Sequence, residues 1–429
     1  MNVLLIGSGG REHALAYKIF ESSKLTKLYC APGNPGIGEF AELVELKTSD
    51  FNQIVVFSKE KEIDLVLVGP EQPLVDGLAD HLRANGVNVF GPNKYAAMIE
   101  GDKSFSKELM KKYNIPTADF EVFTKNEKDK VLSYLNKTNY PTVIKASGLA
   151  AGKGVAICNS KQDALKIVEE YFEDDIFGES GHTIVIEEFL EGEEASIFVV
   201  TDGDEYVILP ASQDHKRALN GDKGKNTGGM GAYSPAPLIT NSLLSQIENE
   251  IIVPSLNALK NEGKKYNGCL YCGLMIIEEG PKLIEFNCRF GDPETQCVLP
   301  LLEGDFLQLL YSAAVGKIDK SAVKYNGGSS VCVVAASKGY PDKYEKGFEI
   351  SGLDLKHENV IIYHAGTKKV DDKFITNGGR VLGVTSVVNE NDLKLAKQTT
   401  YDALSKINFE GITYRTDIAD KALKNNIYY

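Results

Sequence analysis

The first hundred residues alternate apolar, strand-like runs with helical patterns, and this rhythm restricts the fold more than any other feature of the chain. The apolar runs VLLIG, KLYCAP, DLVLVGP and VNVFGP each end in a turn rich in glycine or proline. Strands alternating with helices predict a parallel sheet wound with helices. Ligands of such sheets bind at the carboxyl ends of the strands. We therefore expect four turns to wall one crevice: residues 7–10, 32–36, 69–71 and 91–93.

The pattern changes after this region and indicates further domains. A helix (SFSKELMKKY) begins at about Lys103, strands flank a glycine-rich turn within residues 143–158, and the strand TIVIEEFL follows. Residues 193–325 add a polar glycine-rich loop, a long helix from about Asn241 and the hairpin GLMIIEEGPKLIEFN. From about Asn326, the runs SSVCVVAAS and GGRVLGVTS predict a small α+β domain. The predicted boundaries are 1–102, 103–325 with a subdomain at about 123–190, and 326–429.

Composition excludes several classes of protein. The 429 residues are 43% hydrophobic and 25% charged, which is typical of a globular protein with a large core. A net charge of -13 argues against nucleic-acid binding, because phosphate backbones are held by basic surfaces. The chain has no signal-like N-terminus and no run of eighteen apolar residues, so we expect a cytoplasmic protein without membrane contact. Cys269 and Cys272 form a lone C-x-x-C, which we interpret as buried free thiols rather than a zinc site.

The first glycine turn resembles a dinucleotide-binding fingerprint but fails two of its requirements. Glu12 stands where the third glycine would be, and the second strand ends at Cys30-Ala31 without an acid for a ribose hydroxyl. The backbone amides of Gly9 and Gly10 at a helix start would still suit a phosphate. The alternative is a tight turn that only lets the helix pack on the sheet.

A second glycine-rich loop, from Gly148 to Gly154, is not a P-loop. Its spacing is one residue short, Gly154 replaces the Ser or Thr that would hold magnesium, and a strand rather than a helix follows. A glycine-rich turn between two strands can close over a nucleotide as a lid, with Lys145 and Lys153 offering charge to phosphates. A surface hairpin with incidental lysines is the alternative.

A polar strand carries the candidate metal ligands. In PKLIEFNCRFGDPET, alternation predicts one face with Leu283, Glu285, Asn287 and Arg289, and Ile284, Phe286 and Cys288 on the other. Oxygen ligands two residues apart suit Mg²⁺, which takes its remaining ligands from waters and ATP phosphates. Arg289 would reach the transferred phosphate through a bidentate contact. The alternative is a solvent-facing edge strand.

Two acidic or polar segments add weaker candidates. Glu187 lies near the end of an apolar strand and Glu193 follows the next turn. This arrangement is typical of an adenosine site, and the alternative is an acidic loop exposed to solvent. Asp214, His215 and Lys216 lie in a polar loop that cannot be core. His215 would serve equally as an acid or base and as a positioning or phosphate-binding group.

Taken together, these segments resemble the glycinamide ribonucleotide synthetase (phosphoribosylamine-glycine ligase) family of ATP-grasp ligases over essentially the whole chain. The runs that carry the resemblance are VLLIGSGGREHALA, VGPEQPLVDGLAD, KASGLAAGKGVAI, EEFLEGEEAS, SQDHKRALNGDKGKNTGGMGAYSPAP and IEFNCRFGDPETQCVLPLL. The chain departs from the family at Ser147, where Asp is usual, and at Tyr17, where Trp is usual. The resemblance implies an α/β multidomain fold with an N-terminal parallel α/β domain that binds substrate, an ATP-grasp core with a small lid subdomain, and a C-terminal α+β domain.

The resemblance also implies a reaction and its residues. Glycine would be joined to 5-phosphoribosylamine through glycyl phosphate, with release of ADP, phosphate and glycinamide ribonucleotide in purine biosynthesis. Glu285 and Asn287 would hold Mg²⁺ or Mn²⁺, and the catalytic residues would be Arg289, Asp214 and Lys216. The ATP-binding residues would be Lys103, Lys145, Gly152, Lys153, Glu187, Leu190 and Glu193. The substrate-binding residues would be Gly9, Gly10, Arg11, Asn34, Asp292, Pro293 and Thr295.

Three alternatives and two expectations about partners accompany this interpretation. A carboxylase of aminoimidazole ribonucleotide is disfavoured by the DHKR and NTGGMGAYSPAP runs, a dehydrogenase by the failed fingerprint, and a noncatalytic ATP sensor by the intact set of Glu285, Asn287 and Arg289. We expect a monomer whose partners are glycine, 5-phosphoribosylamine and ATP. Whether the unstable amine arrives through transient contact with the preceding amidophosphoribosyltransferase stays open. We expect no fused downstream purine enzyme, because the chain stops soon after TYRTDI.

Overall fold

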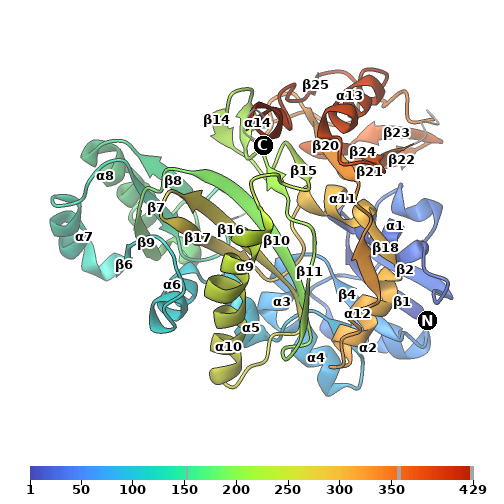
Figure 1. The fold of residues 1–429 in the computed structure, drawn as a ribbon, viewed down its shortest axis with the longest axis horizontal. Helices are drawn as coiled ribbons and strands as arrows, with labels where there is room; N and C mark the ends of the chain where they lie inside the picture. Colours follow the sequence, from blue (N-terminus) through green and yellow to red (C-terminus); the bar gives the residue numbers. More distant parts are fainter. Residues whose placement is uncertain (151–152, 355–358, 426–429) are drawn as a thin grey trace.

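The computed structural model describes residues 1–150, 153–354 and 359–425. Its N-terminal domain contains a five-stranded sheet in which every pair of strands is parallel, as the sequence predicts (Figure 1). In spatial order the strands are β3 (Glu42–Leu43), β2 (Lys27–Pro32), β1 (Asn2–Gly7), β4 (Leu65–Val68) and β5 (Val89–Phe90). The strand patterns did not indicate β3, which is only two residues long.

Helices connect these strands, and two of them, α2 and α5, begin at side-chain caps. Asp50 accepts a hydrogen bond from the Gln53 amide, and Asn93 accepts one from the Ala96 amide, each at 3.0 Å. The helices are α1 (Gly10–Phe20), α2 (Phe51–Glu60), α3 (Glu71–Asp76), α4 (Leu78–Ala84) and α5 (Lys94–Gly101).

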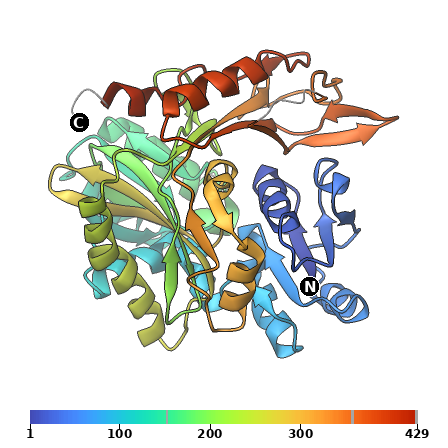
Figure 2. The ribbon, with the colours of Figure 1, turned by 45° about the vertical axis from the view of Figure 1, so that its right-hand side comes forward.

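A small antiparallel unit follows α6 (Lys103–Lys112) and has its own hydrophobic core. Its strand order is β6 (Phe120–Thr124), β9 (Thr183–Glu188), β7 (Thr142–Ala146) and β8 (Val155–Cys158). The helices α7 (Lys128–Leu135) and α8 (Lys161–Phe172) complete it. Figures 1 and 2 both show this lid subdomain at the side of the molecule away from the N-terminal domain.

The central sheet carries the predicted hairpin. Its order is β11 (Tyr206–Ile208), β10 (Glu193–Thr201), β16 (Gly268–Ile277) and β17 (Gly280–Asn287). The predicted long helix is α9 (Asn241–Ile247) joined through a π-helical turn (Glu248–Ile252) to α10 (Val253–Asn261). Helices α11 (Glu294–Val298) and α12 (Phe306–Ala314) follow the sheet. Two further strand pairs are β13 (Arg217–Leu219) with β14 (Lys223–Asn226), and β18 (Leu302–Gly304) with β19 (Val323–Tyr325).

The C-terminal domain is built on a sheet that takes strands from both sides of the predicted boundary at residue 325. Its order is β12 (Gln213–Asp214), β15 (Gly231–Ser234), β20 (Ser329–Ser337), β24 (Arg380–Val388) and β21 (Val360–His364), with β25 (Ile412–Thr413) on β20. The helices α13 (Leu393–Leu404) and α14 (Asp420–Asn425) and the hairpin β22 (Thr367–Val370)–β23 (Lys373–Thr376) complete it. Figure 2 shows this domain lying across the N-terminal and central domains.

The N-terminal and central domains share their hydrophobic cores. One cluster joins Leu4 and Val66 of the parallel sheet to Leu270 and Phe286 of the central sheet. Cys269 and Cys272 belong to two different clusters, and the seven cysteines are free and buried, which confirms the prediction of buried thiols. None of the helices in the described part of the chain has the length and apolar character needed to cross a bilayer.

Candidate active site

The predicted nucleotide lysines, Lys103 and Lys145, lie near each other where α6 begins and β7 runs past it. Lys103 Nζ donates to the Gly148 carbonyl at 3.2 Å, and Lys145 Nζ lies 3.0 Å from Glu187 Oε2. Burial lowers the pKa of Lys103 despite the opposing charge of Glu285. Both ammonium groups are therefore held at the junction between the lid and the central sheet.

Glu187 is shared by two lysines and keeps one oxygen without a partner. Lys107 Nζ lies 3.2 Å from Glu187 Oε2, the same oxygen that Lys145 contacts, and donates to Thr117 Oγ1 at 2.7 Å. Glu187 Oε1 is buried without a hydrogen-bond partner among the described residues. Buried polar atoms are rarely left unpaired, so this oxygen points to a bound ligand or water. Burial lowers the pKa of Lys107 to about 8.

Ser147, one of the departures from the family pattern, joins the end of β7 to the start of α6. Its Oγ donates to Asp102 Oδ1 at 2.6 Å and accepts from the Ser104 amide at 2.8 Å. Asp102 also caps α6 by accepting from the Phe105 amide. The neutral hydroxyl thus fits beside the carboxylate of the cap.

The polar face of β17 differs from the predicted alternation at one position. Gly273 of β16 pairs with Glu285, but the next residue, Leu274, pairs with Leu283, so Ile284 forms a bulge. The bulge turns Leu283 into the core with Phe286 and Cys288. The prediction that Leu283 shares a face with Glu285 was therefore wrong, because a bulge reverses the side on which a strand's residues point.

Four cations surround the Glu285 carboxylate. Burial alone would raise its pKa, but the neighbouring charges outweigh burial and hold the pKa below its usual value. In order of effect, these charges belong to Lys216, Lys145, Lys103 and Arg289. No hydrogen bond to the Glu285 carboxylate occurs in the described part of the chain. The carboxylate is therefore ionised and available to a ligand.

Asn287 and Arg289 contact the same buried acid. With its amide turned to donate, Asn287 Nδ2 lies 3.1 Å from Glu100 Oε1, and its oxygen remains an acceptor. Arg289 lies 2.8 Å from Glu100 Oε1 and 3.2 Å from Glu71 Oε2. Despite burial, these two carboxylates raise the pKa of Arg289, so the guanidinium stays charged. Glu71 is the first residue of α3, directly after the turn that follows β4, so its contact with Arg289 places the N-terminal domain against the central site.

Asp214 is buried and lies beside the half-buried Lys216 and two further acids. Lys216 Nζ lies 2.5 Å from Glu194 Oε2 and 3.9 Å from Asp214 Oδ1, an oxygen without a hydrogen-bond partner among the described residues. Burial raises the pKa of Asp214 to about 8, because the charge of Lys216 is offset by Glu294, Glu194 and Glu285. Tyr271 donates to Glu294 Oε1 at 3.1 Å.

The N-terminal turn is arranged around Glu12. The Gly9 amide donates to Glu12 Oε2 at 2.6 Å, and Arg11 Nε donates to Glu12 Oε1 at 2.6 Å. A Cβ on Gly10 would lie 2.8 Å from Gln296 Nε2, so the turn needs glycine there to approach α11. The Gly9 amide predicted to hold a phosphate is thus already bound to a carboxylate in this structure.

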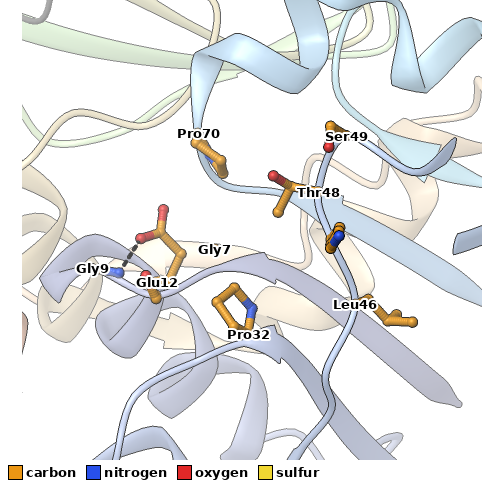
Figure 3. A pocket seen from close by; sticks show the side chains of 10 residues that line it. Gly7, Gly9, Glu12, Pro32, Leu46, Thr48, Ser49 and Pro70 are labelled. Atoms are coloured by element: carbon orange, nitrogen blue, oxygen red, sulfur yellow. Dashed lines mark hydrogen bonds between the residues drawn. The ribbon is translucent and has the colours of Figure 1, made fainter. Parts of the chain in front are cut away.

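Three of the four predicted turns wall one crevice, and the fourth does not. The crevice has a volume of about 560 Å³ and is lined by residues 7–9, Glu12, Pro32, 46–49 and Pro70 (Figure 3). Residues 91–93 lie elsewhere: Gly268, at the start of β16, is so close that a Cβ placed on it would be 3.1 Å from the Gly91 Cα. Expecting this turn in the crevice was wrong, because close packing on the central sheet occupies it.

Asn34 and the 292–295 segment are tied into the protein by their own hydrogen bonds. Asn34 Nδ2 donates to the carbonyls of Ser8 and His364 at 2.8 Å, and its Oδ1 accepts from the Ile37 amide. Asp292 Oδ2 lies 3.0 Å from Arg380, and Thr295 Oγ1 donates to the Gly291 carbonyl. Pro293 packs on the loop that follows β14, where a Cβ on Gly229 would be 2.4 Å from Pro293 Cδ. These contacts join the N-terminal, central and C-terminal domains.

The remaining predicted residues border the site less closely. Glu193 accepts from Gln213 Nε2 at 3.2 Å, Leu190 lies half-buried in the turn before β10, and Lys153 is exposed beyond β7. Gly152 lies outside the described residues. Both ring nitrogens of His215 are buried without a partner in the described ranges, and burial lowers its pKa to about 4, so the ring is neutral near pH 7.

The structure adds acids and bases that the sequence analysis missed. They are Lys107, Glu12, Glu71, Glu100 and Arg380. Lys107 had a usable signal, because residues four apart share a helix face and Lys103 begins the same helix. Glu12 also had a local signal, because an acid three residues after the N-cap position is typical of a capping box. Glu71, Glu100 and Arg380 act across domain contacts that no local pattern contains.

Comparisons with known proteins cover the same three regions. Three family models match: the N domain of phosphoribosylglycinamide synthetase over residues 1–100, its ATP-grasp (A) domain over residues 101–295, and its C domain over residues 330–421. The chain is similar to phosphoribosylamine-glycine ligase of Caldanaerobacter subterraneus subsp. tengcongensis, with 46% identity over 419 residues, covering 98% of this chain and 99% of the relative.

Solved structures agree in fold. A crystal structure of phosphoribosylamine-glycine ligase from Thermotoga maritima has a TM-score of 0.84 and 34% identity, covering 98% of this chain and 100% of the other. The biotin carboxylase domain of 2-oxoglutarate carboxylase from Hydrogenobacter thermophilus, solved with ADP and magnesium, has a TM-score of 0.72 and 18% identity, covering 96% and 91%. The second likeness shows the shared fold alone.

Proposed function

The chain belongs to the phosphoribosylglycinamide synthetase family, and on this premise we propose that it joins glycine to 5-phosphoribosylamine at the expense of ATP. The glycine carboxylate attacks the γ-phosphate of ATP, which gives glycyl phosphate and ADP. The amine of phosphoribosylamine then displaces phosphate and forms the amide of glycinamide ribonucleotide, an intermediate of purine biosynthesis.

The observation that carries this proposal is the group of cations around Glu285. Phosphoryl transfer needs charge neutralisation and alignment more than covalent help from the protein. Lys103, Lys145 and Lys216 converge here with Arg289, from four separate segments of the chain. We assign Lys103, Lys145, Gly152 and Lys153 to the ATP phosphates, and Glu187, Leu190 and Glu193 to adenosine, where the unpaired Glu187 Oε1 offers an acceptor.

The residues present fit a divalent cation. Glu285 supplies an ionised carboxylate and Asn287 an amide oxygen, both hard oxygen donors of the kind that Mg²⁺ or Mn²⁺ prefers. When bound, the ion would neutralise phosphate charge. Glu100 holds the Asn287 amide nitrogen and thereby orients its oxygen, and Arg289 stays charged to steady the acyl phosphate.

We assign glycine to the Asp214–Lys216 pair. Lys216 suits the carboxylate of glycine, and the unpaired Asp214 Oδ1 with Glu294 suits its ammonium group. Gly9, Gly10, Arg11, Asn34 and the 292–295 segment border the amine substrate, Asn34 and Thr295 by holding the walls in place.

Glycine binding should depend on pH through Asp214. Its carboxyl must ionise to hold an ammonium group, and its pKa is raised to about 8, so glycine must displace a proton at lower pH. We expect the KM for glycine to fall as the pH rises from about 6.5 to about 8. The Asp214→Asn variant should lose this dependence. Initial rates at saturating ATP test it, and an unchanged pH profile in the variant would contradict the assignment.

Lys107 should act through Glu187. Replacing Lys107 with methionine removes one of the two cations on Glu187 Oε2, which leaves that carboxylate less well held. We expect the KM for ATP to rise about tenfold while the KM for glycine stays unchanged. Lys111→Met, an exposed lysine on the same helix, is the matched control. Equal rises in both KM values would mean that Lys107 only supports folding.

The function itself is tested by ADP release from Mg-ATP and glycine, with and without phosphoribosylamine generated in place from ribose 5-phosphate and ammonia. We expect ADP only when both substrates are present, and glycinamide ribonucleotide in equal amount. ADP formation with another ribonucleotide would favour a different ligase of the same fold, and ATP binding without turnover would favour a sensor.

We further propose that the enzyme is a cytoplasmic monomer.

Phosphoribosylamine reaches the enzyme either by diffusion or by direct transfer from the amidophosphoribosyltransferase. A scavenger of the free amine, added to a reaction that couples the two enzymes, distinguishes these routes. Complete suppression of product would rule out transient contact between the two enzymes as the delivery route.

A further inference from the structure

A hairpin begins directly after Lys216, one of the two residues that we assign to glycine. It is formed by β13 and β14, and Arg217 pairs with Asn226 at its base. The Thr227 amide and the Thr227 hydroxyl both donate to the Lys216 carbonyl, at 2.8 and 2.9 Å. Residues 217–226 therefore leave and return at Lys216, and their position decides where the backbone of Lys216 lies.

The hairpin is exposed to solvent over most of its length. Residues 219–225 are all exposed, and 60% of the surface of Leu219 is open to solvent. A single two-stranded hairpin is at best marginally stable in water, so this one needs contacts from elsewhere in the protein. Residues 415–421 of the C-terminal domain supply such contacts, and we name this segment the C-terminal clamp.

Arg415 lies at the centre of the C-terminal clamp and is only 2% exposed. Its Nε and one terminal nitrogen donate to the two carboxylate oxygens of Asp417, each at 2.7 Å. The other terminal nitrogen donates to the Arg217 carbonyl at 3.1 Å and to Asp222 Oδ1 at 2.8 Å. Asp417 also accepts from the Gly221 amide at 2.8 Å. Because a bidentate contact fixes the orientation of a guanidinium, Asp417 aims the free end of Arg415 at the hairpin.

Two further residues of the C-terminal clamp reach the tip of the hairpin. Asn220 Nδ2 donates to Thr416 Oγ1 at 2.6 Å, and the Thr416 amide donates to Asn220 Oδ1 at 3.0 Å. Lys421 Nζ lies 2.8 Å from Asp222 Oδ2. Lys421 belongs to α14, which Figure 1 shows beside β14. The C-terminal clamp thus holds the hairpin both at its first residue and at its tip.

We propose that the C-terminal clamp positions Lys216 for glycine by holding the hairpin in place, with Arg415 as its central positioning residue. The inference rests on the proposed function, because it takes Asp214 and Lys216 as the glycine ligands. A hairpin that is loose for part of the time lowers the apparent affinity for glycine in proportion to the competent fraction of the enzyme. Saturating glycine restores the competent state, so loosening the hairpin should raise the KM for glycine and leave kcat unchanged.

A hairpin-side variant, Asn220→Ala/Asp222→Asn, tests this role. Both side chains are exposed, and Asp222 has a φ of 53°, a conformation that asparagine tolerates, so the variant keeps the backbone. It loses the contacts with Thr416 and the negative charge that Arg415 and Lys421 share. We expect the KM for glycine to rise about tenfold, while kcat and the KM for ATP stay unchanged. Amide exchange of the hairpin, followed by mass spectrometry, should become faster.

A clamp-side variant and a control complete the comparison. Arg415→Met should give the same pattern with a larger rise in the KM for glycine, and the hairpin-side variant decides the question if Arg415→Met does not fold. Lys421 is kept in both variants, because its Nζ also lies 3.6 Å from Glu193 Oε2 in the proposed adenosine site. Asp204→Asn removes another exposed acid that two lysines share, in the turn between β10 and β11. This control should change neither KM value nor the amide exchange of the hairpin.

The outcomes separate this inference from the proposed function. If the hairpin exchanges faster but the KM for glycine stays the same, the C-terminal clamp does not position the glycine site and the inference is wrong. Unchanged exchange in both variants would also overturn it, because the hairpin would then be held without the clamp. Equal rises in the KM values for glycine and ATP would contradict it as well, since they indicate a general loss of structure. If wild type forms no glycinamide ribonucleotide, the proposed function fails, whereas an active wild type with unaltered variants overturns this inference alone.

Discussion

A Glu285→Gln enzyme should release ADP about a thousandfold more slowly than wild type, with kcat reduced rather than the KM for glycine raised. Glutamine keeps the size of the side chain but removes the negative charge on which four cations converge. Without this charge, the three lysines and Arg289 repel one another. The proposed metal site also loses the carboxylate of Glu285 and keeps only the amide oxygen of Asn287 from the chain's two proposed ligands. The measurement is ADP release at saturating substrates.

Two controls make this result specific. Glu279→Gln, an exposed acid at the end of the same hairpin, should leave the rate unchanged. Binding of Mn²⁺ in the presence of ADP, followed by electron paramagnetic resonance, should weaken in Glu285→Gln but not in Glu279→Gln. If the Glu285→Gln enzyme binds Mn²⁺ as tightly as wild type does, Glu285 is not a metal ligand.

Arg289→Met should lose both activity and stability. Arg289 is the shared partner of Glu100 and Glu71, and Glu100 is buried. Breaking a buried ion pair from one side leaves an uncompensated charge and costs about 3 kcal/mol of unfolding free energy. Loss of the guanidinium that steadies the acyl phosphate should lower kcat by about a hundredfold to a thousandfold. Urea unfolding and ADP release measure the two effects.

A second substitution separates these roles. In Arg289→Met/Glu100→Gln, the buried charge left by the first change is removed, so much of the lost stability should return. Activity should not return, because the guanidinium is still absent. Recovery of activity together with stability would show that Arg289 serves folding alone.

Local patterns were sufficient for four strands of the parallel sheet, for the lid strands β7, β8 and β9, and for the β16–β17 hairpin, but not for the short strand β3 or for β6. In each case the signal lies within a few residues: an apolar run, a glycine or proline turn, or alternation. The same reasoning failed at Leu283, because a bulge depends on how β16 pairs with β17. It also misplaced residues 91–93, whose position is decided by the close approach of Gly268.

In the candidate active site too, residues within one local pattern could be predicted from the sequence, whereas residues brought together by distant segments could not. Glu285, Asn287 and Arg289 could be identified as a polar face of one strand, and that face does meet Lys103, Lys145 and Lys216. Glu100 and Glu71 could not be identified, because they reach Arg289 from segments about two hundred residues earlier. Asn34 resembled a ligand-binding residue on a glycine-rich turn, but its amide joins Ser8 to His364.

The pairing of β12 with β15, and of β15 with β20, has a consequence during translation. Asp214 lies on β12, and β20, which joins the β12–β15 pair to the rest of the sheet, begins at Ser329. The ribosome therefore releases the lysines for ATP and the carboxylate of Glu285 well before the Asp214 segment can take its final place. A nascent or prematurely terminated chain that lacks the residues from Ser329 onward would therefore carry the proposed nucleotide groups without the strand on which the Asp214 segment folds.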